Sequence, residues 1–195
     1  NRAVTGATPR SASVQDITLD EAASTFGTLA LTGANVAMTD AGATDLGAST
    51  VSGTLGITSA GAVTDSGTLA ITGATTISAS GQDITLDEAA STFGTLALTG
   101  ANVAVTDAGA TDLGASTVSG TLGITSGGAI TDSGTLAITG AATLDNSGGT
   151  NDAITLDDSS NAFNGTVTFT TDSGSAVTIV DTTALDLVAL TAASL

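Results

Sequence analysis

Residues 54–78 read TLGITSAGAVTDSGTLAITGATTIS, and this stretch decides the fold. It contains four short segments, which are Thr54–Ile57, Ala62–Val63, Thr68–Ile71 and Thr75–Ile77. In most of them apolar residues stand two positions apart, which is the spacing of a β-strand. β-branched residues are frequent, and Gly, Asp or Ser separates the segments as turn residues do. No apolar stripe at helical spacing persists in the chain, so the sequence predicts an all-β protein.

The stretch belongs to an internal repeat of 67 residues. Residues 15–81 recur as residues 82–148 with only seven differences, and residues 149–195 form a diverged, partial third copy. Long repeats of this kind indicate one solenoid rather than separate globular units. Residues 1–14 then form a lead-in segment. The differing pairs are Met38/Val105, Ala60/Gly127, Val63/Ile130, Thr75/Ala142, Ile77/Leu144, Ser78/Asp145 and Ala79/Asn146.

The number of apolar segments sets the expected size of one winding. Nine segments occur in the first 67-residue copy, and three of them would build a three-sided winding of about 22 residues. We therefore predict a three-sided parallel β-helix of about eight windings, with three windings in each repeat and a length of roughly 40 Å. One predicted row of stacked core residues is Ile17, Met38, Val63, Ile84, Val105, Ile130, Ile154 and Val177.

The charge of the chain is strongly unbalanced. There are 19 acidic residues and two basic ones, Arg2 and Arg10, so residues 11–195 contain no basic side chain. The carboxylates must therefore be hydrated, hydrogen-bonded or neutralised by cations from the medium. Nucleic acid and anionic membrane surfaces would be repelled and are not expected as partners. No apolar run is long enough for a membrane-spanning helix.

The residue types that are missing argue against catalysis. The chain contains no His, Cys, Lys or Tyr, so the usual general bases and nucleophiles are absent, and no side chain can activate Ser. A pair of carboxylates could cleave a glycosidic bond. Such a site also needs aromatic or cationic groups that hold sugar, and this chain cannot supply them. We predict that the protein is not an enzyme.

Recurring acidic residues suggest Ca²⁺ as the one candidate cofactor. Asp20-Glu21 and Asp87-Glu88 are equivalent in the first two copies, and Asp157-Asp158 takes the same place in the third. The oxygen-rich stretch from Asp145 to Asp152 is a further candidate. Stacked carboxylates repel one another, and a hard cation with oxygen ligands would relieve that repulsion. Solvated acids at turns are the alternative interpretation. The candidate ligands are Asp20, Glu21, Asp87, Glu88, Asp145, Asp152, Asp157 and Asp158.

Thr and Phe residues also recur with the repeat. We predict a Thr row along one face, and a flat Thr array would favour ice binding, although only Thr166–Thr170 has a regular alternation of Thr. Thr is also a common strand residue, so lateral binding of ice or a glycan stays an alternative. Phe26, Phe93 and Phe163 are predicted core residues. The Thr row is Thr18, Thr39, Thr64, Thr85, Thr106, Thr131, Thr155 and Thr178.

Residues 120–131 (GTLGITSGGAIT) and 134–144 (GTLAITGAATL) resemble the repeats of filamentous haemagglutinin-like adhesins. These are large bacterial surface proteins exported by two-partner or autotransporter routes, and the resemblance extends over roughly residues 17–190. It implies a right-handed β-helix, a secreted or surface-attached fibre, and roles in adhesion or biofilm formation.

On this resemblance we expect a structural rod that projects a distal binding region. Its partners would be flanking repeats or neighbouring rods, and a receptor would bind regions outside this chain. Neither terminus shows a closing feature, so we expect the chain to be part of a longer protein. Cation-dependent lateral assembly is the alternative function.

Overall fold

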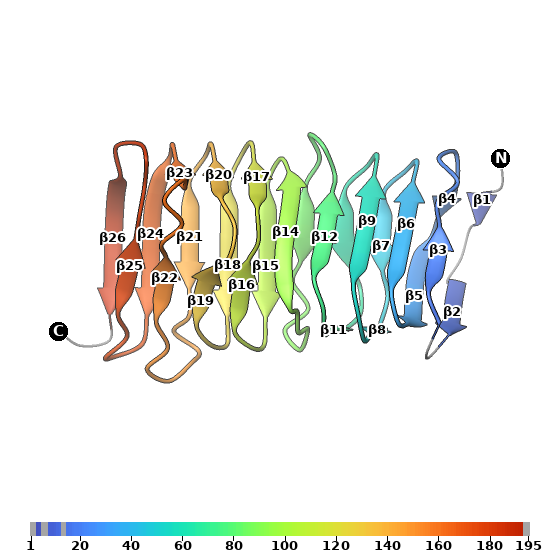
Figure 1. Cartoon of the computed structure of the whole chain (residues 1–195), viewed down its shortest axis with the longest axis horizontal. Helices are drawn as coiled ribbons and strands as arrows, with labels where there is room; N and C mark the ends of the chain where they lie inside the picture. The colour runs from blue at the N-terminus through green and yellow to red at the C-terminus, as the bar shows by residue number, and fades with distance from the viewer. Residues whose placement is uncertain (1–2, 5–7, 13–14, 193–195) are drawn as a thin grey trace.

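A computed structural model describes residues 3–4, 8–12 and 15–192, with side chains from residue 15 to residue 190. All regular elements in these ranges are β-strands, and no helix long and apolar enough to cross a membrane occurs among them. Two sheets of twelve strands each form the molecule, and they lie one behind the other in Figure 1. A separate two-stranded sheet pairs β1 (Ala3–Val4) with β4 (Thr25–Phe26).

We call the two large sheets sheet I and sheet II. Sheet I contains β3 (Ile17–Leu19), β6 (Val36–Asp40), β9 (Leu55–Ser59), β12 (Thr75–Ser78), β14 (Thr95–Gly100), β16 (Thr111–Leu113), β17 (Ser116–Val118), β19 (Ile130–Asp132), β20 (Leu136–Ile138), β22 (Ile154–Leu156), β23 (Ala162–Phe163) and β25 (Val177–Ile179). Sheet II contains β2 (Thr8–Ala12), β5 (Thr28–Gly33), β7 (Thr44–Leu46), β8 (Ser49–Val51), β10 (Val63–Asp65), β11 (Leu69–Ile71), β13 (Ile84–Leu86), β15 (Val103–Asp107), β18 (Leu122–Ser126), β21 (Ala142–Asp145), β24 (Thr166–Thr171) and β26 (Asp186–Ala192).

The chain alternates between the two sheets and advances by one strand spacing in each winding. Every strand pair is parallel, and register partners are separated by 17 residues at Leu29–Leu46 and by 25 at Ala142–Val167. In Figure 1 the chain rises in the front sheet and descends in the back sheet while it advances from right to left, which is a right-handed winding. The predicted parallel β-helix is confirmed, with about nine turns.

Most windings, such as β7–β9 and β18–β20, contain three strand segments, and two of these belong to the same sheet. Thus β7 and β8 both pair with β5, and a bend at Gly47-Ala48 separates them. The bend is held from inside, because the buried Ser49 hydroxyl donates to the Gly47 carbonyl at 2.7 Å and accepts the Leu31 N–H at 2.9 Å. Such a winding has two sides, one built from a single strand and one from two short strands.

This arrangement gives the 67-residue repeat an odd number of sides. The first copy contributes seven, in the order β3 with β4, β5, β6, β7 with β8, β9, β10 with β11, and β12. Three and a half windings therefore separate the two copies, rather than the predicted three. As a result β5 lies in sheet II, whereas its counterpart β14 lies in sheet I. Each later copy therefore places its strands in the opposite sheet from the equivalent strands of the copy before it.

The predicted stacking rows are consequently divided between the sheets. Val63 is the register partner of Ile84, and Ile154 of Val177, but Ile17 pairs with Val36 rather than stacking toward Met38. The predicted Thr row is broken in the same way: Thr64 pairs with Thr85 in sheet II, and Thr131 pairs with Thr155 in sheet I. The single rows were wrong because they assumed three whole windings in each repeat.

The core is a continuous column of aliphatic side chains between the sheets. One row in sheet I consists of Met38, Ile57, Ile77 and Leu98, which are register partners in successive windings and are all buried. Each buried side chain of this size contributes about 1.5–3 kcal/mol to stability. The predicted Phe positions are confirmed: Phe93 and Phe163 are buried, and Phe26 packs against the core. The exposed large apolar residues are Val180, Leu185, Leu187, Val188 and Leu190, near the C-terminal end.

Candidate functional site

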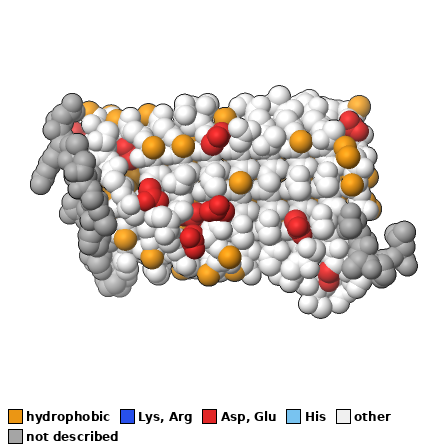
Figure 2. Space-filling view, turned by 180° about the vertical axis from the view of Figure 1, so that it is seen from behind, with side chains coloured by type: hydrophobic (Ala, Val, Ile, Leu, Met, Phe, Trp, Pro, Cys, Tyr) orange, Lys and Arg blue, Asp and Glu red, His pale blue; other side chains and the backbone are white. Residues whose placement is uncertain are grey.

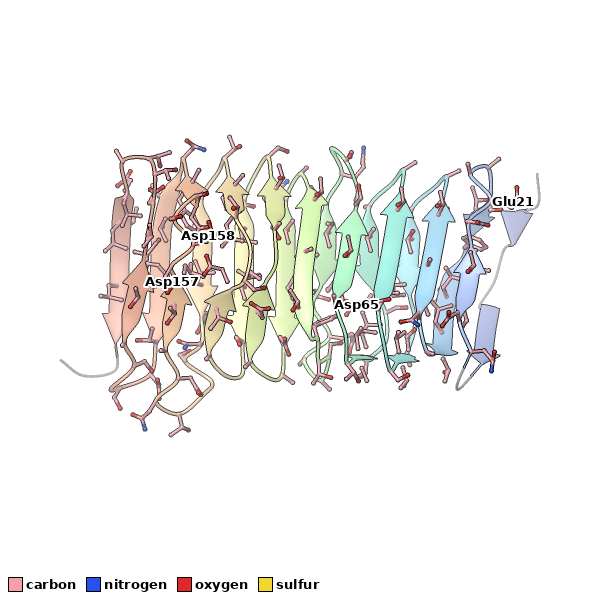
Figure 3. All side chains as sticks on the ribbon, in the orientation of Figure 1. Glu21, Asp65, Asp157 and Asp158 are labelled. Carbon is pink, nitrogen blue, oxygen red and sulfur yellow. The ribbon has the colours of Figure 1, made fainter. Side chains whose placement is uncertain are left out.

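The predicted acidic pairs lie where the chain leaves a sheet, directly after β3, β13 and β22. Asp20, Glu21, Asp87 and Asp157 are exposed, and Glu88 and Asp158 are half-buried. Figure 3 labels Glu21 near the N-terminal end of the solenoid, and Asp157 and Asp158 near the C-terminal end. The structure therefore distributes the pairs along the molecule and does not gather them at one site.

Two of the pairs are held by a carboxylate from the preceding winding. Asp65, at the end of β10, accepts the Asp87 N–H at 2.9 Å and the Glu88 N–H at 3.4 Å. Burial raises the pKa of Asp65, the two N–H bonds lower it, and the neighbouring Asp87 and Glu88 charges raise it further, so the pKa lies above its ordinary value. This carboxylate fixes the backbone of the acidic loop, which is a structural role.

The same arrangement recurs in the third copy. Asp132 accepts the Asp157 N–H at 2.9 Å and the Asp158 N–H at 3.3 Å. It also accepts a bond from the side-chain amide of Asn161, which is completely buried. The Asn161 amide oxygen in turn accepts the Leu136 N–H at 2.7 Å. The acidic pairs are therefore parts of loops that neighbouring windings anchor through hydrogen bonds.

Asp145 ends β21 and Asp152 lies in the loop between β21 and β22, and residues of this loop donate hydrogen bonds to both carboxylates. Asp145 accepts the N–H and the hydroxyl of Ser147 at 2.9 and 2.7 Å. Asp152 accepts the Thr150 N–H at 3.0 Å. Among the described side chains, no three His, Cys, Asp or Glu residues are placed together so that they could hold a metal ion. Calcium binding by the eight acidic residues stays a prediction.

A second set of acids faces the interior at the corner after the longer strands. Asp40 ends β6, is 1% exposed, and accepts the Gly42 N–H at 2.8 Å and the Thr44 hydroxyl at 3.3 Å. Its counterpart Asp107 ends β15 and repeats both bonds. Burial raises the pKa of Asp107 and outweighs the hydrogen bonds from the Gly109 and Phe93 N–H groups and the Thr111 hydroxyl. These acids stabilise sharp corners.

Two equivalent shallow grooves lie on opposite faces of the molecule. The first, on sheet I, has Ala37 and Gly56 in its floor, because these residues carry almost no side chain between their longer neighbours. Asp20 and Ser78 also line it. The second groove, on sheet II, is lined by the residues 67 positions later, and Asp145 takes the place of Ser78. The odd number of sides in each repeat places the same groove on both faces.

The face formed by sheet II is mostly polar. Figure 2 shows it with acidic side chains near the middle, scattered apolar side chains, and no basic side chain among the described residues. A cationic or neutral ligand would meet no repulsion here, whereas a polyanion would.

The sequence analysis missed two buried polar side chains near the Asp145–Asp152 loop. Asn146 is completely buried and Thr171 is 3% exposed. The Asn146 amide oxygen and the Thr171 hydroxyl have no hydrogen-bond partner. A signal for Asn146 was present, because it replaces Ala79 in an otherwise nearly identical copy. Thr171 is in a diverged copy and gave no comparable signal.

A family model described as repeats of unknown function (DUF5649) matches residues 33–99 and 100–170, which together make up more than half of the chain. No curated protein and no solved structure matches this chain. The first match spans 67 residues, the length of the internal repeat.

Proposed function

Because the chain belongs to this family of repeats, whose description assigns no activity, we propose its function from the geometry of the solenoid: it is a structural rod of a secreted bacterial surface adhesin or extracellular fibre. The observation that carries the proposal is the continuous parallel pairing of strands from β3 to β25 in sheet I and from β5 to β26 in sheet II. A rod of this kind holds a distal binding region at a fixed distance.

Stiffness follows from the way the windings are joined. Backbone hydrogen bonds connect each winding to the next on both sheets, and one apolar core runs between them. Bending the rod in either direction would separate windings on one of its faces and break these bonds. Because each repeat contacts only its neighbours, added repeats lengthen the rod without changing its cross-section.

The composition supports a passive role outside the cell. The chain has no His, Cys, Lys or Tyr, and the recurring buried carboxylates are engaged in corner and loop hydrogen bonds. Its resemblance to filamentous haemagglutinin-like repeats supports an adhesin stalk.

Labelling of intact cells with an antibody against this chain tests the proposed location outside the cell. A signal that is seen only after cell lysis would contradict that location.

A repeat-insertion experiment tests the rod itself. A further copy of residues 82–148 placed after Gly148 adds three and a half windings. We expect the maximum dimension in small-angle X-ray scattering to increase by about 17 Å, because stacked strands are about 4.8 Å apart. The cross-sectional radius should stay constant. An unchanged maximum dimension, or a wider particle, would contradict the rod.

A second candidate function is lateral binding, which the two equivalent grooves favour. Neutral glycans and ice are the candidate ligands, because an acidic face does not repel them. Binding of the isolated chain to glycans, or shaping of ice crystals, would favour this function over a passive rod. Unchanged ice growth together with no glycan binding would leave the rod as the sole function.

A further inference from the structure

Two long loops lie together at one edge of the solenoid, where they extend at the lower left of Figures 1 and 3. Residues 146–153 connect β21 to β22, and residues 172–176 connect β24 to β25. The corresponding connections in the preceding copy, residues 79–83 and 101–102, are each three residues shorter. The loops are in contact, because the Asn151 N–H donates to the Asp172 carboxylate at 2.5 Å.

Beneath these loops the inward-facing corner positions become polar. In the first copy Ala79 follows Ser59 at this corner, and Ala79 is completely buried. In the second copy Asn146 follows Ser126 in the same way. Thr171 follows Asn146 in the next winding, because Asp145 and Thr170 are register partners. The second and third copies therefore place two buried polar side chains next to each other, at a corner where the first copy has the buried Ala79.

Each of these side chains has an oxygen without a hydrogen-bond partner in the protein. The Asn146 amide is directed into the loop, since its nitrogen donates to the Asp152 carbonyl at 2.7 Å. Its oxygen, like the Thr171 hydroxyl, is buried without a partner. A buried oxygen without a partner is unfavourable, and native proteins normally supply one. The Thr75 hydroxyl is also buried without a partner, but its register neighbours are Leu55 and Leu96. Asn146 and Thr171 instead follow one another in successive windings, so only here do two such groups offer neighbouring oxygens to a ligand among the described residues.

We propose that the paired oxygens of Asn146 and Thr171, under the loop that ends at Asp152, form a binding site for one Ca²⁺ ion. Hard cations take amide, hydroxyl, carbonyl and carboxylate oxygens as ligands. Asp145, Asp152 and Asp172 make the two loops acidic, and no basic residue occurs after Arg10 to neutralise them. The ion would join the two loops and the windings that carry them.

The charge of the site limits its affinity. No three carboxylates converge here among the described residues, so most ligands would be neutral oxygens. Weakly charged calcium sites of extracellular modules have dissociation constants of about 10⁻⁴–10⁻³ M. We expect an affinity in this range, which suits extracellular calcium concentrations.

Calorimetric titration of the full chain with CaCl₂ tests the proposal. We expect one site, and at least tenfold weaker binding for Asn146→Ala. This variant should fold, because Ala79 occupies the equivalent buried position in the first copy. Asp186→Asn, at an exposed acid that is not among the candidate ligands, is the matched control and should leave the affinity unchanged.

Three outcomes would overturn the calcium site. They are no binding at millimolar Ca²⁺, equal affinity in the parent and in Asn146→Ala, and many weak sites that salt abolishes. No binding together with a crystal structure that shows a water molecule between Asn146 and Thr171 would assign these oxygens to solvent. The rod would stand in each case, because its test measures length and does not depend on Ca²⁺.

Discussion

At the scale of single residues, close approach of successive windings decides which positions must be glycine. Gly67 lies over the bend of the preceding winding, and a Cβ there would be 2.3 Å from the Ala48 backbone nitrogen. Because backbone atoms cannot move aside as a flexible side chain can, an added methyl group would push the windings apart. At Gly56 the nearest atom to an added Cβ is the Val36 carbonyl oxygen at 3.7 Å, an ordinary contact.

This contrast gives a matched pair of variants. We expect Gly67→Ala to lower the free energy of unfolding by about 1–3 kcal/mol, the range for overpacked sites. Gly56→Ala should change it by no more than about 0.5 kcal/mol. Urea denaturation followed by far-UV circular dichroism measures both. The second copy has Gly134 at the position equivalent to Gly67. Equal effects of the two substitutions would show that contacts between windings do not explain why glycine occurs at both positions.

At the scale of the strand, the bend within one side depends on a buried hydroxyl. Ser116, the first residue of β17, donates to the Gly114 carbonyl at 2.8 Å and accepts the Leu98 N–H of the preceding winding at 3.0 Å. Ser49 makes the same two bonds in the first copy. A serine therefore completes the ladder of hydrogen bonds where the chain bends away from it.

Substitution of this serine should lower the free energy of unfolding by more than the small size of its side chain suggests. Ser116→Ala leaves the Leu98 N–H buried without an acceptor, and we expect a loss of about 1–3 kcal/mol in the free energy of unfolding. Thr117→Ala, at the exposed next position, is the control and should change it by less than about 0.5 kcal/mol. Thermal or urea unfolding compares the two, and similar losses would contradict a special role for the buried hydroxyl.

At the scale of the whole molecule, acidic groups determine how stability depends on pH. Burial raises the pKa of Asp65 and Asp107 above the ordinary value of 3.8. The folded chain therefore binds these protons more tightly than the unfolded chain, and stability increases as pH falls from neutral toward 3.8. Protonation also reduces the repulsion that arises from the net charge of −17.

The trend should reverse in stronger acid. A hydrogen bond from the Ser175 hydroxyl, with another from the Asn151 N–H, lowers the pKa of Asp172. Burial would raise the pKa of Asp181, but bonds from the Thr183 and Phe163 N–H groups and the Thr183 hydroxyl outweigh it and lower the pKa. The stability that these two carboxylates contribute is present above pH 3.8, and it is lost as the pH falls through their lower pKa values in the folded chain.

Melting temperatures measured from pH 7 downward test this dependence. We expect the melting temperature to rise on mild acidification and to fall again below about pH 3.8. Asp65→Asn should make the rise smaller, because one of the two groups that cause it is gone. A melting temperature that falls steadily from pH 7 would contradict the assignment.

The candidate site was predictable only in part. Asp145 and Asp152 were named from the oxygen-rich composition of their loop, which is a local property of the sequence. The pairing of Asn146 with Thr171 was not predicted, because these residues are 25 positions apart and meet only through the register of β21 with β24. The anchoring of Asp87 and Glu88 by Asp65 was missed for the same reason.

The sequence by itself determined that this chain is an all-β parallel solenoid with an aliphatic interior, and the right-handed winding is read from the structure (Figure 1). Apolar residues two apart, turn residues between them and a long repeat are signals that can be read from the sequence, and together they favour stacked windings as the way to bury the core. Only the tertiary structure decided that each repeat has seven sides, so that equivalent strands of successive copies lie in opposite sheets. Whether a short segment begins a new sheet or continues the old one depends on bends such as Gly47-Ala48, and the adjacent winding fixes their geometry.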